Sequence, residues 1–141
     1  MKYFFIALTS LFMTFNCEAQ QLMKNVTLED AQKIKDNEQN FINKPLKTLF
    51  KEIKPTIKVV SGYPGNLETA GHFTFTFVEY KEHDELRKKQ KFPLSIIVFV
   101  KEPFEWNTKE RHDKEILWNK EDEKKYGDLT ILRIDILDAT P

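Results

Sequence analysis

Residues 72–80 constrain the fold more than any other stretch of this chain, because apolar and polar side chains alternate along them. Phe73, Phe75 and Phe77 fall on every second position. Successive side chains of a β-strand point to opposite faces, so the three rings share one face of a half-buried strand. We expect this face to pack against N-terminal helices, through contacts with Leu28, Ile34, Leu49 or Phe50.

Four other segments show strand patterns. Residues 57–60 form a short apolar run, and residues 94–101 and 129–137 are apolar on both of the faces that a strand would have. Strands of the latter kind are typical of the centre of a sheet. Residues 115–118 are predicted to form a short additional strand. Between the strands, residues 81–91 are polar and are interpreted as a long hairpin connection that could include a helical turn.

Helix signals lie mainly before the strands. Thr27 is followed by two acidic residues, which predicts a helix N-terminus, and apolar residues then recur at spacings of three and four up to residue 42. Pro45 separates this helix from a second one over residues 46–53. A brief third helix is predicted over residues 120–126, after an Asn cap.

Helices first and strands later, without βαβ alternation, predict an α+β fold. We expect N-terminal helices packed on one face of a mostly antiparallel four- to five-stranded sheet. This element order resembles that of cystatin-like folds and of small lipoproteins of outer-membrane assembly. The resemblance implies the layer arrangement only; it brings no shared residue motif and therefore no catalytic residues.

The N-terminus carries an export pattern. Lys2 gives a positive start, residues 3–15 are uncharged and mainly apolar, and Ala19 ends a small-x-small site. This arrangement is typical of a cleaved secretory signal peptide. The apolar run is too short to span a bilayer. We therefore predict a signal peptide over residues 1–19, a single α+β domain over residues 20–141, and a periplasmic or secreted location.

Cys17 opens an alternative, in which it is the lipidated first residue of a membrane-anchored lipoprotein. The residues before it do not match the usual lipoprotein pattern. Cys17 is also the only cysteine of the chain. After cleavage at Ala19 the mature domain would contain none, which excludes disulfides, thiol nucleophiles and thiolate metal sites.

Several function classes lack their sequence signals. The chain has 22 basic and 22 acidic residues, so no overall positive field favours nucleic acid. His72, His83 and His112 lack metal-ligand spacing, and neither Ser61 nor Ser95 lies in a nucleophile motif. No glycine-rich phosphate loop is present. We therefore predict no catalytic residues, no metal site and no cofactor.

Two local features are candidates for binding. Phe104 and Trp106, within a polar loop over residues 102–113, are proposed with Trp118 as anchors for a partner or a sugar ring. The alternative is that these rings close the end of the sheet as part of the core. The basic stretch over residues 87–91 could contact an acidic polymer or lipid headgroups, or could form a solvated tip.

These observations favour an exported, non-enzymatic binding or interaction module, whose partner is expected to be a protein or a component of the cell envelope. One alternative is a small carboxylate-dependent hydrolase, for which Glu79 with Glu82, or Asp135 with Asp138, are candidate pairs. The other is a carrier that holds a small ligand between helix and sheet.

Overall fold

The structure is a computed structural model that describes residues 26–53, 57–66, 68–107 and 117–138. The predicted signal peptide, Cys17, His112 and the first half of the predicted strand over residues 115–118 lie outside the described residues. Leu117 and Trp118 are described and are not in a strand.

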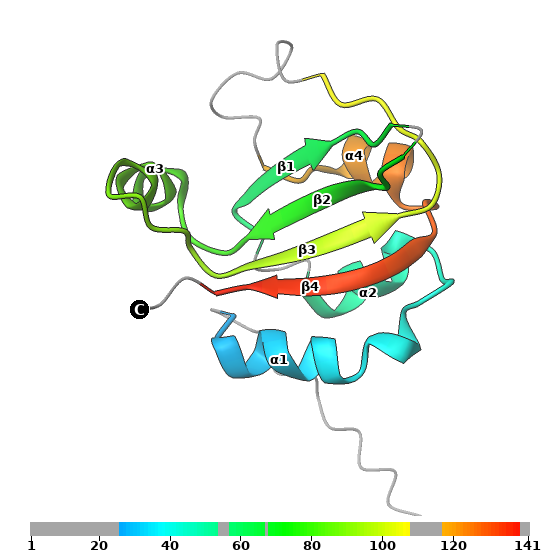
Figure 1. Cartoon of the computed structure of the whole chain (residues 1–141), viewed down its shortest axis with the longest axis horizontal. Helices are drawn as coiled ribbons and strands as arrows, with labels where there is room; N and C mark the ends of the chain where they lie inside the picture. The colour runs from blue at the N-terminus through cyan, green and yellow to red at the C-terminus, as the bar shows by residue number, and fades with distance from the viewer. Residues whose placement is uncertain (1–25, 54–56, 67, 108–116, 139–141) are drawn as a thin grey trace, which may run out of the picture.

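Four strands form one antiparallel sheet in the order β1-β2-β3-β4, so each strand pairs with its neighbour in sequence (Figure 1). The sheet confirms the predicted α+β class and the antiparallel pairing. The cystatin-like element order is not confirmed; α3 (Tyr80–Lys88) lies between β2 and β3, and α4 (Lys120–Tyr126) between β3 and β4. The strands are β1 (Val59–Tyr63), β2 (Gly71–Thr76), β3 (Ser95–Val100) and β4 (Ile131–Leu137).

The helices are α1 (Leu28–Asp36), α2 (Leu46–Ile53), α3 (Tyr80–Lys88) and α4 (Lys120–Tyr126). As predicted, α1 and α4 begin at side-chain caps; Thr27 and Asn119 each form a capping box. Within the described ranges, none of the helices is both long and apolar enough to cross a bilayer.

Three segments differ from the sequence expectation. The first strand covers Val59–Tyr63 instead of residues 57–60. The first helix ends at Asp36 instead of running to residue 42, because the Asn37 side chain donates to the Lys33 carbonyl and a 3-10 turn (Glu38–Asn40) follows. The strand predicted over residues 72–80 ends at Thr76, and Tyr80 instead begins α3. This helix occupies most of the predicted hairpin connection.

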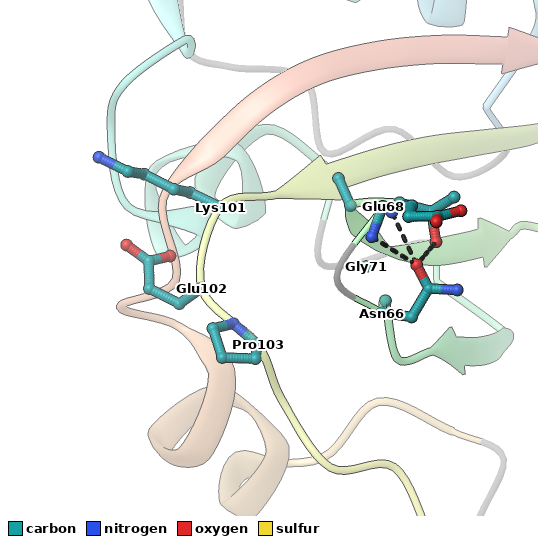
Figure 2. A pocket seen from close by; sticks show the side chains of 9 residues that line it. Asn66, Glu68, Gly71, Lys101, Glu102 and Pro103 are labelled. Atoms are coloured by element: carbon teal, nitrogen blue, oxygen red, sulfur yellow. Dashed lines mark hydrogen bonds between the residues drawn. The ribbon is translucent and has the colours of Figure 1, made fainter.

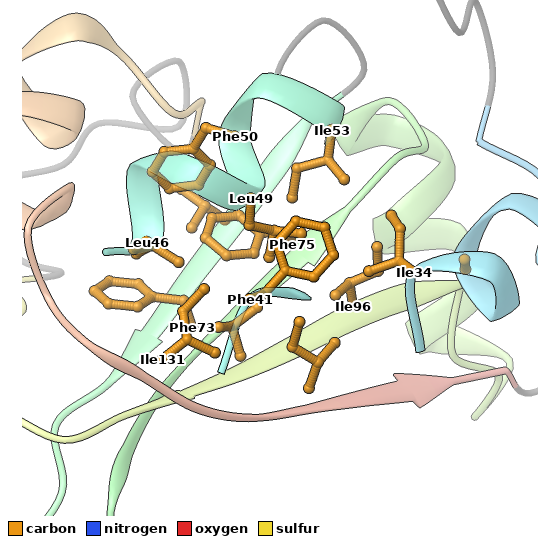
Figure 3. Close-up of a cluster of buried hydrophobic side chains, with 14 of the residues drawn as sticks. Ile34, Phe41, Leu46, Leu49, Phe50, Ile53, Phe73, Phe75, Ile96 and Ile131 are labelled. Atoms are coloured by element: carbon orange, nitrogen blue, oxygen red, sulfur yellow. The ribbon is translucent and has the colours of Figure 1, made fainter. Parts of the chain in front are cut away.

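One face of the sheet forms the core together with α1, α2 and α4 (Figure 3). Phe73 and Phe75 are fully buried there and Phe77 is 9% exposed, which confirms the predicted phenylalanine face. Ile34, Leu49 and Phe50 lie in the same cluster. Leu28, the remaining residue offered for this contact, is not part of the cluster.

Leu28 is 46% exposed, because it is the first residue of α1 and projects from the start of the helix. Val26, just before the cap, takes the buried position there, and Ala31 one turn further along is also buried. A residue before the cap thus packs near the fourth helical residue, as in a hydrophobic staple.

The connection from α1 to α2 covers the outer edge of β4. The Asn43 N–H donates to the Ile131 carbonyl, and the Ile131 N–H donates to the Lys44 carbonyl. Further along the edge, the Lys35 ammonium donates to the Ile134 carbonyl over 2.7 Å. Backbone groups that could pair with another strand are therefore used within the domain at these positions.

Candidate binding site

Residues 102–107 cross the end of the sheet on its core side as an extended segment. Exposure alternates along it: Phe104 and Trp106 are half-buried, and Pro103, Glu105 and Asn107 are exposed. The Phe104 ring stacks on Phe73 with ring centres 4.3 Å apart, and Trp106 meets Phe73 edge-on at 5.5 Å. The Tyr126 hydroxyl donates to the Glu105 carbonyl over 2.7 Å and holds the segment in place.

Two glycines make room for these rings. A Cβ atom at Gly71 would lie 2.6 Å from Cε1 of Phe104, and one at Gly62 would lie 2.6 Å from Cγ of Trp106. Real Cβ atoms do not approach other heavy atoms so closely. The absence of side chains on β1 and β2 at these points therefore allows both rings to rest on the sheet backbone.

Trp118, the third predicted binding residue, is half-buried against Phe50, with ring centres 4.6 Å apart. Its indole Nε1 is buried and has no acceptor among the described residues. The structure thus brings Phe104, Trp106 and Trp118 together around Phe73, packed on the core. Their role in binding stays a prediction.

A pocket of about 660 Å³ lies between the β1–β2 connection and the residues that lead into this segment (Figure 2). Asn66 shapes one wall, because its Oδ1 accepts from the backbone of Glu68 and from the backbone and hydroxyl of Thr69. Glu68 and Lys101 are exposed and form no ion pair within the described residues.

Glu102 also lines this pocket, but its carboxylate is already engaged. It accepts from the backbone N–H and the hydroxyl of Thr130, each over 2.6 Å. Burial raises the pKa of Glu102, and the hydrogen bonds from Thr130 outweigh burial, so the pKa lies below its ordinary value. Glu102 therefore ties β3 to the start of β4 and is a poor proton donor.

The opposite face of the sheet is not covered by α1, α2 or α4 (Figure 1). Strand pairing aligns one residue from each strand into a row across this face: Tyr63 lies beside His72, His72 beside Phe99, and Phe99 beside Arg133. We call this surface the open face, and it includes a second row formed by Ser61, Thr74, Ile97 and Asp135. A third row lies at the end nearer α3; three of its residues, Val59, Thr76 and Ser95, are buried and the fourth, Leu137, is half-buried.

The side chains of the first row stack on one another. The Tyr63 and His72 ring centres are 4.8 Å apart with nearly parallel planes, and His72 and Phe99 are 5.1 Å apart. The Arg133 guanidinium lies over the Phe99 ring at 4.0 Å. Tyr63 is 53% exposed at one end of the row, and Arg133 is exposed at the other. The row is thus an ordered surface feature made of side chains from all four strands.

The burial of His72 within this row predicts how the stability of the protein depends on pH. Burial, and secondly the Arg133 charge, lower the pKa of His72 from 6.5, so the unfolded chain takes up a proton before the folded protein does. We expect the free energy of unfolding to fall as the pH drops through 6.5. His72→Gln should reduce this fall, measured by urea denaturation between pH 7.5 and 5.5.

His83 provides the comparison for this experiment. Burial and Arg87 also lower its pKa, against an opposing effect of Asp84. His83→Gln should therefore remove a separate part of the dependence, and the double variant should remove both parts. An unchanged slope in His72→Gln would show that His72 is protonated equally easily in the folded and unfolded chains.

The carboxylates considered as acid–base pairs are engaged with cations where partners are described. Glu79 lies 2.8 Å from the Lys58 ammonium. Asp135 lies 3.0 Å from Arg133 and 3.5 Å from Lys35. Among the described residues no three His, Cys, Asp or Glu side chains gather into a group that could hold a metal ion.

Neither a protein-family model, nor a curated protein, nor a solved structure matches the chain. The candidate site therefore rests on its own geometry. The alternation along residues 72–80 places His72 on the face opposite the phenylalanines, but sequence reasoning did not group His72 with Tyr63, Phe99 and Arg133. Their alignment depends on strand register, and a single sequence does not reveal which residues of different strands lie side by side.

Proposed function

We propose that this protein is an exported, non-enzymatic interaction module that binds another protein through the open face of its sheet. Export is proposed from the N-terminal sequence pattern over residues 1–19. The observation that carries the binding proposal is the stacked row from Tyr63 to Arg133, which stays partly exposed although it is built from large side chains.

The orientation of the rings favours a protein as the partner. Sugars and nucleobases bind aromatic residues by stacking on ring faces. Here the faces of His72 and Phe99 are already covered by their neighbours within the row. Tyr63, 53% exposed at the end of the row, stacks on His72 alone among the described rings, and Arg133 is exposed at the other end. Tyrosine and arginine are among the residues that most often dominate the energy of protein–protein contacts.

The rest of the open face suits such a contact. Ser61, Thr74 and Ile97 in the second row are half-buried and bear small hydroxyl or apolar groups. Arg133 is paired with Asp135 within the same face. A partner that covers this surface does not have to bury an unpaired charge there, which would be costly.

Site-specific photo-crosslinking in the cells that make the protein tests this proposal. A photoreactive amino acid replaces Thr74, a half-buried residue in the second row of the open face, or Lys124 on α4 as a control. We expect a protein adduct of defined mass from position 74 and none from position 124. Tyr63→Ser should abolish the adduct while leaving the melting temperature nearly unchanged. Adducts that form equally at both positions, or that survive Tyr63→Ser, would contradict the proposal.

The pocket favours a second candidate function, that of a small-ligand carrier. Its volume of about 660 Å³ is within the range of ligand sites. Protein purified from its own cells under native conditions should then show an added small-molecule mass in native mass spectrometry, and Ala70→Trp should remove it by filling the pocket. An equal added mass in both proteins would place the ligand elsewhere.

A further inference from the structure

The α3–β3 connection forms a basic surface feature separate from the open face. We call it the basic tip, and it consists of Arg87, Lys88, Lys89, Lys91 and Phe92, all of which are exposed. None of the residues of α3 is buried, and the helix projects beyond the end of the sheet (Figure 1). The tip is therefore accessible to a large partner.

The backbone of the tip is held in one conformation. Gln90 has a positive φ of 58°, the Lys91 N–H donates to the Leu86 carbonyl, and the Gln90 N–H donates to the Arg87 carbonyl. This pair of hydrogen bonds around a left-handed residue is the Schellman motif that ends many helices. It fixes the direction in which the chain leaves α3 and so places Lys91 and Phe92 directly after the basic end of the helix.

Three of the cations are not neutralised. Lys88 pairs with Asp84 over 2.6 Å, but Arg87, Lys89 and Lys91 form no ion pair with any residue in the described part of the chain. The acidic residues of α3 lie earlier in the helix, so charge is separated along its axis. The chain as a whole has no net charge, which makes this positive end a local feature.

Phe92 stands beside these cations and is 57% exposed, more than any other large hydrophobic side chain that the structure describes. A purely ionic partner would pair with the cations but would leave this apolar ring in water. It suits the boundary between lipid headgroups and acyl chains, where cations meet phosphates and aromatic rings enter the apolar region.

We infer that the basic tip docks the protein onto the surface of an anionic phospholipid bilayer. Arg87, Lys89 and Lys91 contact headgroup phosphates, and Phe92 inserts just below them. A soluble polyanion would meet the same cations but would leave Phe92 in water, so the ring distinguishes the two kinds of partner. The inference does not depend on a protein partner at the open face.

Co-sedimentation of the full chain with vesicles tests the inference. The quantity measured is the ratio of affinity for vesicles of phosphatidylglycerol and phosphatidylcholine to affinity for vesicles of phosphatidylcholine alone. The N-terminal residues also carry a cation, Lys2, but they are the same in every variant, so differences in this ratio between variants report on the basic tip. We expect a ratio well above one that falls steeply as salt is added, because exposed charges are screened.

Three variants identify the surface. The triple variant Arg87→Gln, Lys89→Gln, Lys91→Gln should lower the ratio about a hundredfold, from about fivefold for each charge removed. The matched variant Lys51→Gln, Lys101→Gln, Lys124→Gln removes three other exposed lysines and should leave the ratio within about twofold. Phe92→Ser should weaken binding to anionic vesicles about tenfold without lowering the melting temperature.

Several outcomes would overturn the inference. A ratio near one would exclude docking to anionic lipid, and equal losses in the two triple variants would show a diffuse charge effect. Unchanged vesicle binding in Phe92→Ser, together with tight binding to heparin, would indicate that the tip recognises a soluble polyanion.

Discussion

Phe75→Ala is expected to lower the free energy of unfolding by about 3–5 kcal/mol, the range for deleting a fully buried aromatic ring. Phe75 is 0% exposed, and its ring meets Phe50 edge-on at 5.5 Å and Trp118 at 5.4 Å. Removing it leaves a cavity between the sheet and α2 that rigid neighbours fill poorly. Urea denaturation followed by far-ultraviolet circular dichroism measures the loss.

Thr74→Ala is the matched control, because the neighbouring position on β2 faces the other side of the sheet and is half-buried. We expect it to cost less than about 1 kcal/mol. Thr76 is a poorer control, since it is 2% exposed and its hydroxyl lies 2.8 Å from that of Ser95. Small and equal losses at positions 74 and 75 would mean that the two faces of the sheet are assigned the wrong way round.

Gly62→Ala should destabilise the protein by about 1–3 kcal/mol through overpacking. The added methyl group would meet the Trp106 ring, whose Cγ and Cε3 atoms lie 2.6 and 2.7 Å from the ideal Cβ position. The ring must move off the sheet, so Trp106 should also become more accessible to fluorescence quenchers. Ser61→Ala, one residue earlier on the opposite face, should show neither effect.

A double-mutant cycle attributes this loss to the ring. Combined with Trp106→Leu, the Gly62→Ala change should cost markedly less than it does alone, because the smaller side chain leaves room for the methyl group. If Gly62→Ala costs the same in both backgrounds, the loss comes from the β1 backbone and not from a clash with Trp106.

The parts of the fold that sequence predicted well are those with a local cause. The alternation of Phe73, Phe75 and Phe77 revealed the buried face of β2, and the caps at Thr27 and Asn119 placed the starts of two helices. α3 was only allowed for as a helical turn, because its mainly charged sequence shows little apolar periodicity. Its C-terminal end is set by the turn at Gln90, and the Asp84–Lys88 pair links its last two turns.

The candidate sites depend on contacts between segments that are far apart in the sequence, and the sequence alone does not predict these contacts. Phe104 and Trp106 alternate with exposed residues, a pattern equally compatible with rings that face solvent or rings that face the sheet. The rings face the sheet because Gly62 and Gly71, which lie far earlier in the chain, have no side chains and leave space for them. Similarly, the row through His72 exists only once the register of three strand pairs is known.

Cysteine protection in intact cells tests most directly the central claim that the open face is a binding surface. The sequence contains one cysteine, Cys17, so single cysteines placed at positions 61, 74, 51 and 124 can be followed against the unsubstituted protein. Positions 61 and 74 lie in the second row of the open face, and in the purified protein all four should react with N-ethylmaleimide, because none of the four positions is buried. In cells, positions 61 and 74 should react several times more slowly while 51 and 124 keep their rates. Equal rates in cells and in solution at every position would contradict the proposed function.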